Sequence, residues 1–225
     1  RQLARADMVL AGNAYLADYS RRHNANVHIV PTTVDTDLYR PTRRPQPDAP
    51  VVIGWSGSPT TVPYFETLTP VLAALQAQYG DKIRFRLIGD AAYRCPELNL
   101  TGERWTVEAE LAALDAFDIG VMPLPDDAWA QGKCGLKGLT YMAFERAAVL
   151  APVGVNRTII RHGENGLLAA TPEDWKNMLA QLIENYDLRV RLGQAGRRTV
   201  EAEYSVHAWR DKYVALLQAA AALRK

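Results

Sequence analysis

The sequence predicts an α/β domain with a doubly wound parallel sheet and helices on both faces. Short β-rich runs alternate with helical runs along almost the whole chain, which is the pattern of successive strand–helix units. Several β-rich runs are continuously apolar, as strands buried between two layers of helices are. With 225 residues and a hydrophobic fraction of 48%, the chain can bury a sizeable core.

The first 45 residues are predicted to form a small unit followed by a linker. Strands are expected at Met8–Ala11 and Val27–Val30, with Asn13 as the N-cap of a helix over residues 14–23 between them. The segment Thr42–Pro50 contains three prolines and few apolar residues, which is typical of a linker. Because the chain begins in the middle of this pattern and without methionine, we expect residues 1–45 to end a preceding domain and residues 46–225 to form the main domain.

The main domain is expected to contain a regular series of strands and helices. Its predicted strands cover residues 51–55, 83–88, 119–122 and 148–151, with a shorter one within 98–105. A helix is predicted over 107–114, and another over 64–79. The apolar face of the helix over 64–79 consists of Phe65, Leu68, Val71, Leu72 and Leu75. The tail from Glu173 onward is helical, with breaks expected at Gly193, Gly196 and Ser205.

Composition and charge exclude several classes of function. The formal net charge is +1, from 26 basic and 25 acidic residues, so no nucleic-acid partner is expected. Cys95 and Cys134 lie far apart and show no metal-ligand spacing, which favours a reduced, cytoplasmic setting over a disulfide framework or zinc site. The sequence contains no run of 18 apolar residues, so no membrane-spanning helix is predicted. A peripheral contact of the parent protein with the inner face of a membrane stays open.

A basic turn follows the strand predicted at residues 119–122. Lys133 and Lys137 are four residues apart, so they share one face if this segment is helical, and Gly132 and Gly135 permit close backbone approach. Two neighbouring ammonium groups repel each other, and a diphosphate between them would turn that repulsion into attraction. The alternative is a pair of solvated surface lysines, and the two interpretations are about equally supported.

Two further turns have the composition of anion sites at strand ends. After the strand at 148–151, the backbone amides of Val153, Gly154, Val155 and Asn156 precede a short helix, with Asn156 as its expected N-cap. Taken alone, this turn is slightly better explained as a loop-to-helix transition without a ligand. The Gly57-Ser58 turn is a weaker signal, because it has neither a GxGxxG pattern nor a P-loop lysine. Ligands of open α/β sheets bind outside the carboxyl ends of the strands, so all three turns are expected there.

The acidic residues and histidines favour structural roles. Asp126 and Asp127 are adjacent and have no third ligand nearby, so a solvated loop is favoured over a metal site. Glu108 and Glu110 are interpreted as first-turn acids that complement a helix dipole. The four histidines are scattered, and none forms a nucleophile–base pattern. No metal is predicted.

The chain resembles the C-terminal, nucleotide-sugar-binding domain of a GT-B glycosyltransferase of the family 4 type. The resemblance covers nearly the whole chain. Its most specific parts are three segments: FDIGVMPLPDDAWAQGKCGLKGLTYMA, VLAPVGVNRTIIRHGENGLLA and GRRTVEAEYSVHAWRDKY. The opening segments RADMVLAGNAYLADY and VHIVPTTVDTDLYRP are similar to the part of such enzymes where the chain leaves the N-terminal domain.

This resemblance implies a fold and an activity. The family has two Rossmann-like domains: the second binds an activated nucleotide-diphosphate sugar, and the first binds a glycan, lipid or small-molecule acceptor. The sugar is transferred with retention at the anomeric carbon, usually without a metal and with no cofactor besides the donor. Lys133 and Lys137 would be the catalytic cations, and Gly57, Ser58, Gly135 and the turn Val153–Asn156 would surround the diphosphate. A fragment without the acceptor domain is expected to have little activity.

The chain also departs from the family pattern. Many members have a Glu-x7-Glu pair where Gly132 and Thr140 stand here, which puts the usual ribose contact near Thr140 in doubt. The GKCGxK pattern is similar to a bacterial branch of the family. Two other interpretations therefore remain: a non-catalytic module that binds a nucleotide or a partner, and a sugar-nucleotide epimerase or hydrolase on the related fold.

Overall fold

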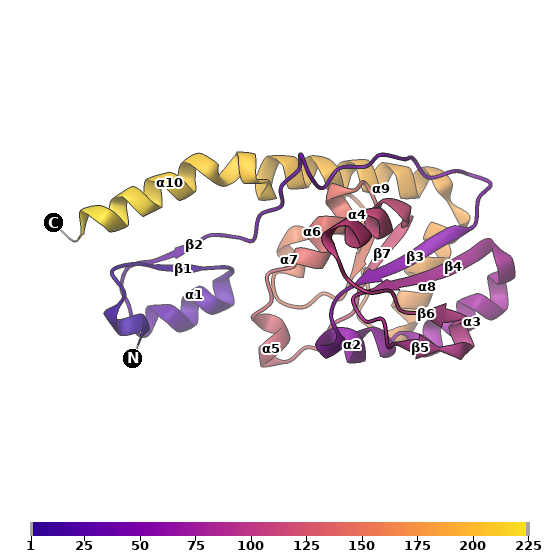
Figure 1. Cartoon of the computed structure of the whole chain (residues 1–225). Helices are drawn as coiled ribbons and strands as arrows, with labels where there is room; N and C mark the ends of the chain where they lie inside the picture. Colours follow the sequence, from indigo (N-terminus) through magenta and orange to yellow (C-terminus); the bar gives the residue numbers. More distant parts are fainter. Residues whose placement is uncertain (1, 224–225) are drawn as a thin grey trace.

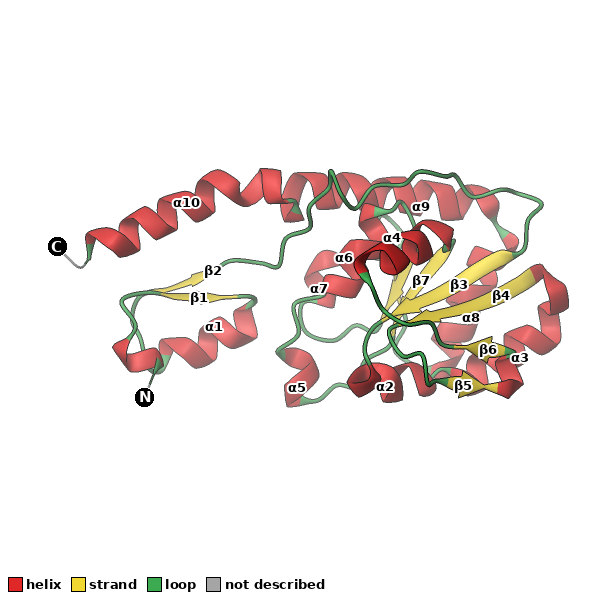
Figure 2. Cartoon of the chain, viewed as in Figure 1, coloured by secondary structure: helices red, strands yellow, loops and turns green. Residues whose placement is uncertain are grey.

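The protein is built around a five-stranded sheet in which every neighbouring pair of strands is parallel (Figures 1 and 2). This computed structural model describes residues 2–223. The order in the sheet is β4-β3-β7-β8-β9. The bounds are β3 Val51–Ser56, β4 Ile83–Ile88, β7 Ile119–Met122, β8 Ala147–Leu150 and β9 Leu167–Leu168. Strands β3, β4, β7 and β8 therefore lie where the sequence predicts them, within one residue at each end.

Helices cover both faces of the sheet, which confirms the predicted fold class. The first face packs against α2 (Val62–Glu66), α3 (Thr69–Tyr79) and α8 (Pro172–Glu184). The second face packs against α4 (Val107–Ala116) and α6 (Leu136–Ala143). A short antiparallel hairpin, β5 (Arg94–Cys95) with β6 (Leu100–Thr101), takes the place of the shorter strand expected within 98–105. The remaining helices are α1 Ala14–Arg21, α5 Ala128–Gln131, α7 Asn156–Ile159, α9 Tyr186–Thr199 and α10 Val206–Ala222.

Two predictions about helix continuity are wrong. The helix expected over residues 64–79 is divided into α2 and α3, because Pro70 has no N–H group to donate to the carbonyl of Glu66 and its ring would clash with that carbonyl in a continuous helix; Pro70 instead lies in the first turn of α3. Its predicted apolar face is nevertheless buried. In the tail, Ser205 does begin a new helix as its N-cap, but Gly193 and Gly196 lie inside α9. A Cβ on Gly193 would lie 2.0 Å from the carbonyl oxygen of Glu145, so this glycine lets α9 pack closely on the turn before β8.

The first part of the chain forms a separate β–α–β unit. Strands β1 (Val9–Ala11) and β2 (Val27–Ile29) pair in parallel, and Asn13 caps α1 between them, as predicted. From its start beside Val34, α10 extends away from the five-stranded sheet along the side of this unit (Figure 1). No helix within residues 2–223 is both long and apolar enough to cross a membrane.

Candidate functional site

Lys133 and Lys137 both lie at the carboxyl edge of the sheet, meaning the edge where β3, β7 and β8 end. Lys133 stands between α5 and α6, and its Nζ is 5.4 Å from the ring centroid of Tyr64 and 5.7 Å from that of Trp129. Lys137 stands in the first turn of α6, with Nζ 5.5 Å from the ring centroid of the buried Trp55. Aromatic faces attract cations without neutralising them, so both lysines keep a charge for a ligand.

The charge of Lys137 is held in an unfavourable place. Burial, followed by the neighbouring positive charge of Lys133, lowers the pKa of Lys137 to about 8, and the carboxylate of Glu110 acts in the opposite direction. The two lysines are therefore close enough to repel each other. A bound polyanion would relieve that repulsion and stabilise the charged form of Lys137.

The backbone of the basic loop, defined here as residues 131–137, allows the turn after β8 to pack closely against it. Gly135 adopts a left-handed conformation (φ +73°) as the residue before α6, and it is buried. A Cβ at Gly135 would lie 2.4 Å from Cδ1 of Ile159 and 3.3 Å from Cγ1 of Val155. The basic loop thus packs directly on the turn that follows β8, and two of the predicted turns lie together.

The turn after β8 differs from its prediction in one respect. Asn156 is not the N-cap of α7: the cap position is Val155, and Asn156 is the first helical residue. Its side chain is 1% exposed, and Nδ2 donates to the carbonyl of Ala151 at 3.0 Å, so Asn156 holds the turn against the strand end instead of facing a ligand. The backbone N–H of Val153 donates to the carbonyl of Ala151, and the backbone N–H of Asn156 donates to the carbonyl of Val153. An anion at this turn would meet Gly154 and Val155 first.

The turn after β3 borders the same edge. Gly57 donates its N–H to the carbonyl of Ile88 at the end of β4 and packs against the indole of Trp55, the residue whose ring faces Lys137. Ser58 forms a capping box with Thr61 at the start of the following 3-10 helix. Its hydroxyl lies 3.0 Å from that of Thr60 and 3.3 Å from that of Thr61.

Thr140 does not present its hydroxyl to the surface. The residue is 4% exposed, and Oγ1 donates to the carbonyl of Lys137 at 2.9 Å. The Thr140 side chain therefore forms a hydrogen bond within α6. At this position the family resemblance suggests a side chain that contacts the ribose of the nucleotide.

Glu110 is the residue of this edge that the sequence did not indicate. Its Oε1 accepts from the Ser56 hydroxyl at 2.7 Å, and Oε2 accepts from the Tyr39 hydroxyl at 3.4 Å. Next to Ser56, the buried Tyr141 hydroxyl accepts from the Ser56 N–H and donates to the carbonyl of Val121. Because α4 runs back from the carboxyl edge, its first turn places Glu110 near Lys137. The helical position of Glu110 was predicted, but its partners come from segments 54 and 71 residues away.

The adjacent carboxylates of the loop after β7 have structural roles. Asp127 is the N-cap of α5 and accepts from the N–H of Ala130 at 2.7 Å, while Asp126 accepts from the side chain of Gln131. Across residues 2–223, no group of three or more histidine, cysteine, aspartate or glutamate side chains is arranged to hold a metal ion.

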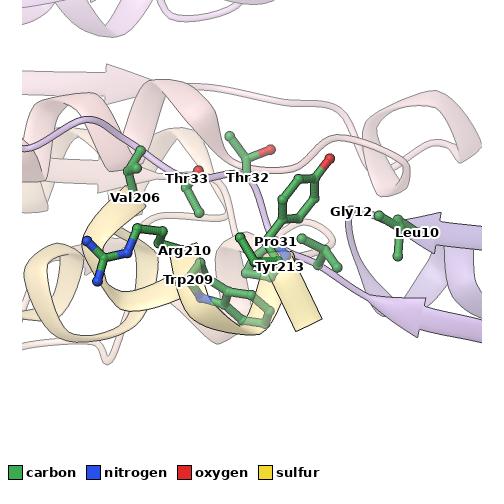
Figure 3. A pocket seen from close by; sticks show the side chains of 11 residues that line it. Leu10, Gly12, Pro31, Thr32, Thr33, Val206, Trp209, Arg210 and Tyr213 are labelled. Carbon is green, nitrogen blue, oxygen red and sulfur yellow. The ribbon is translucent and has the colours of Figure 1, made fainter. Parts of the chain in front are cut away.

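A pocket of about 560 Å³ lies elsewhere, between the first unit and α10 (Figure 3). Trp209, Arg210 and Tyr213 of α10 form one side, and Pro31, Thr32 and Thr33 form the other. Its lining includes none of the predicted site residues. We place the candidate site at the carboxyl edge, because that is where Lys133, Lys137 and the strand-end turns coincide.

Comparisons with known proteins agree with this fold. Sucrose-phosphate synthase from Thermosynechococcus elongatus is 17% identical and superposes with a TM-score of 0.72, over 98% of this chain and 60% of that one. HepE from Anabaena, in complex with UDP and glucose, is 14% identical with a TM-score of 0.73, over 95% and 63%. The C-terminal domain of a glycosyl transferase group 1 protein (LpcC) from Francisella tularensis is 19% identical with a TM-score of 0.53, over 77% and 99%.

The chain thus spans less than two thirds of the sucrose-phosphate synthase and HepE chains and nearly all of the LpcC C-terminal domain. No curated protein sequence matches it significantly. The family model of the glycosyl transferases group 1 matches residues 51–185, which is more than half of the chain and includes all five strands of the sheet. This chain belongs to the glycosyl transferases group 1 family.

Proposed function

We propose that this chain is the donor-binding half of a retaining glycosyltransferase of the family 4 type. Residues 46–225 would bind a nucleotide-diphosphate sugar, and residues 1–45 would be the end of a preceding domain that binds a glycan, lipid or small-molecule acceptor. The observation that carries the proposal is the pair Lys133 and Lys137, two repelling cations at the carboxyl edge of the sheet. The complexes of HepE with UDP and with UDP-glucose support a diphosphate ligand for this fold.

The lysines would act on the leaving group. When the bond between the anomeric carbon and the diphosphate breaks, negative charge develops on the diphosphate oxygens. Lys133, Lys137 and the nearby backbone amides would stabilise that charge from fixed positions, which is a preorganised electrostatic effect. Neither a protein nucleophile nor a metal in this half is needed for that step. We propose a cytoplasmic location, with a peripheral membrane contact if the acceptor is a lipid.

Calorimetric titration of the chain with UDP, GDP, ADP and TDP tests the proposal, with and without magnesium. One nucleotide should bind saturably, and Lys133→Ala combined with Lys137→Ala should weaken its binding at least about tenfold, because two charge-assisted contacts are lost. The matched control is Lys82→Ala combined with Lys176→Ala. It removes the same charge from two exposed positions away from the site and should leave the affinity within about twofold.

Equal weakening by both double variants would contradict a specific lysine site. A non-catalytic module would bind the nucleotide but support no transfer when the acceptor domain is present. An epimerase or hydrolase would instead convert the donor without any acceptor, which product analysis would detect.

A further inference from the structure

The side chain of Asn13 joins the first unit of the chain to the basic loop. Asn13 lies directly before α1 and is 4% exposed. Its Nδ2 donates to the carbonyl of Lys133 at 2.9 Å and to that of Gln131 at 3.3 Å, while Oδ1 accepts from the N–H of Leu16 at 2.9 Å. One amide group therefore caps α1 and also holds a loop 118 to 120 residues further along the chain.

Packing around Asn13 reinforces these hydrogen bonds. The backbone at Gly12 lies so close to Cys134 that a Cβ there would be 2.4 Å from Sγ. Leu16, after Asn13 in the chain, packs against Gly132: a Cβ added to Gly132 would lie 3.6 Å from Cδ2 of Leu16. The basic loop is thus held against the first unit along its whole first half.

Holding a carbonyl group also orients the next N–H group. In a planar trans peptide, the carbonyl of Lys133 and the N–H of Cys134 point in opposite directions. Because the carbonyl is bound by Asn13, the N–H of Cys134 faces the other side of the basic loop. The side chain of Lys133 leaves the same short stretch of backbone, so its starting position is fixed as well.

We propose that Asn13 is a positioning residue of the donor site. It holds the basic loop so that Lys133 and the N–H of Cys134 face the diphosphate. This inference rests on the proposed function, because the diphosphate is the ligand in question. It also links two parts of the chain: any movement of the first unit away from the main domain breaks both hydrogen bonds and releases the loop.

Two substitutions separate this role from helix capping. Asn13→Asp keeps an oxygen that can cap α1, but it places a second carboxylate oxygen against the two carbonyls that Nδ2 now bonds. Asn13→Ser also keeps a capping oxygen, on a side chain too short to reach the basic loop. The matched control is Asn24→Ala. The Nδ2 of Asn24 likewise donates to two carbonyls, those of Leu3 at 2.8 Å and Ala6 at 2.7 Å, but both lie within the first unit.

Titration of the full 225-residue chain with UDP, GDP, ADP and TDP gives the first readout. Asn13→Asp and Asn13→Ser should each raise the Kd of the nucleotide that binds by at least about fivefold, because two hydrogen bonds that shape the site are lost. Asn24→Ala should leave that Kd within about twofold, although it loosens the first unit. The proposal is overturned if both Asn13 variants bind as the wild type does, or if Asn24→Ala weakens binding equally.

Hydrogen exchange gives a second readout that needs no ligand. In Asn13→Asp, amides of residues 131–136 should exchange faster than in the wild type, whereas Asn24→Ala should leave their exchange unchanged. Unchanged exchange in Asn13→Asp would overturn the role of Asn13 whether or not a nucleotide binds. Failure of all four nucleotides to bind the wild type would instead contradict the proposed function, and the exchange experiment would still decide the inference.

Discussion

The two edges of the five-stranded sheet bury positive charge in different ways. At the amino edge, where the strands begin, the side chain of Arg146 is fully buried and bonds to Asp115 at 2.8 Å and to the carbonyl of Arg43. At the carboxyl edge, Lys133 and Lys137 face aromatic rings and each other. Arg146 thus has a counter-ion within the fold, although the structure gives its Nε and Nη1 no hydrogen-bond partner among the described residues. A pair that repels is stable only because its surroundings enforce it, which is typical of a binding site.

The pKa values at the two edges show the same contrast. Burial would raise the pKa of Asp115, but hydrogen bonds from Thr42 and the charge of Arg146 hold it below its usual range. At the carboxyl edge, burial and Lys133 act together to lower the pKa of Lys137, and Glu110 only partly opposes them. The amino edge is therefore expected to contribute to stability, and the carboxyl edge to binding.

The largest expected effect is at the amino edge. Asp115→Ala should lower the free energy of unfolding by about 3 kcal/mol, because it leaves the buried guanidinium of Arg146 without its counter-ion. Chemical denaturation measures this change. The control is Asp81→Ala, because Asp81 is exposed and its replacement should lower the free energy of unfolding by less than about 0.5 kcal/mol. A loss below about 1 kcal/mol for Asp115→Ala would remove the contrast between the edges.

Nucleotide affinity should depend on pH through Lys137. In the free protein its pKa is about 8, and a bound diphosphate favours the protonated form, so binding takes up a proton above that pH. The Kd should be nearly constant below about pH 8 and then rise by up to about tenfold per pH unit. Titrations from about pH 7 to about pH 9 measure the slope. A slope that persists in Lys137→Met would assign it to another group.

Removing the charge of Lys137 should stabilise the free protein. The pKa is lower in the folded protein than in the unfolded chain, so stability rises with pH from about 8 to the unfolded value of about 10.4. Lys137→Met should therefore raise the free energy of unfolding at neutral pH by about 1 kcal/mol, a gain that disappears at high pH. Thermal unfolding at several pH values measures it. A destabilised variant would show that the lysine is structural, as Arg146 is.

The smallest expected effect concerns Glu110. Without this carboxylate the charged form of Lys137 is less stable, so Glu110→Gln should move the alkaline loss of nucleotide binding to lower pH by about half a unit. The matched control is Glu108→Gln on the same helix, because Glu108 is exposed and interacts with Thr106. Equal shifts in the two variants would indicate a general effect of net charge and not a contact with Lys137.

Local patterns in the sequence predicted most of the elements but not all of their connections. Strands β3, β7 and β8 are short runs of mostly apolar residues, and β4 alternates apolar residues with Arg84 and Arg86; each was placed correctly because both patterns are typical of strands. Gly193 was misplaced because a glycine that breaks a helix and one that permits close packing look the same in a sequence. Asn156 was misplaced for a similar reason: its side-chain Nδ2 donates to the carbonyl of Ala151, and no rule for helix capping predicts that contact.

By itself, the sequence determined the class of fold, the strand-end turns and the two lysines, because each depends on residue type and short spacing. The tertiary structure alone decided which distant groups meet them. It brought Glu110 to Ser56 across 54 residues and Asn13 to the basic loop across 120, and it buried Thr140. These contacts depend on the order of the strands in the sheet and on where each helix returns. The charge of a site follows from its residues, but the partners that tune it follow from the topology.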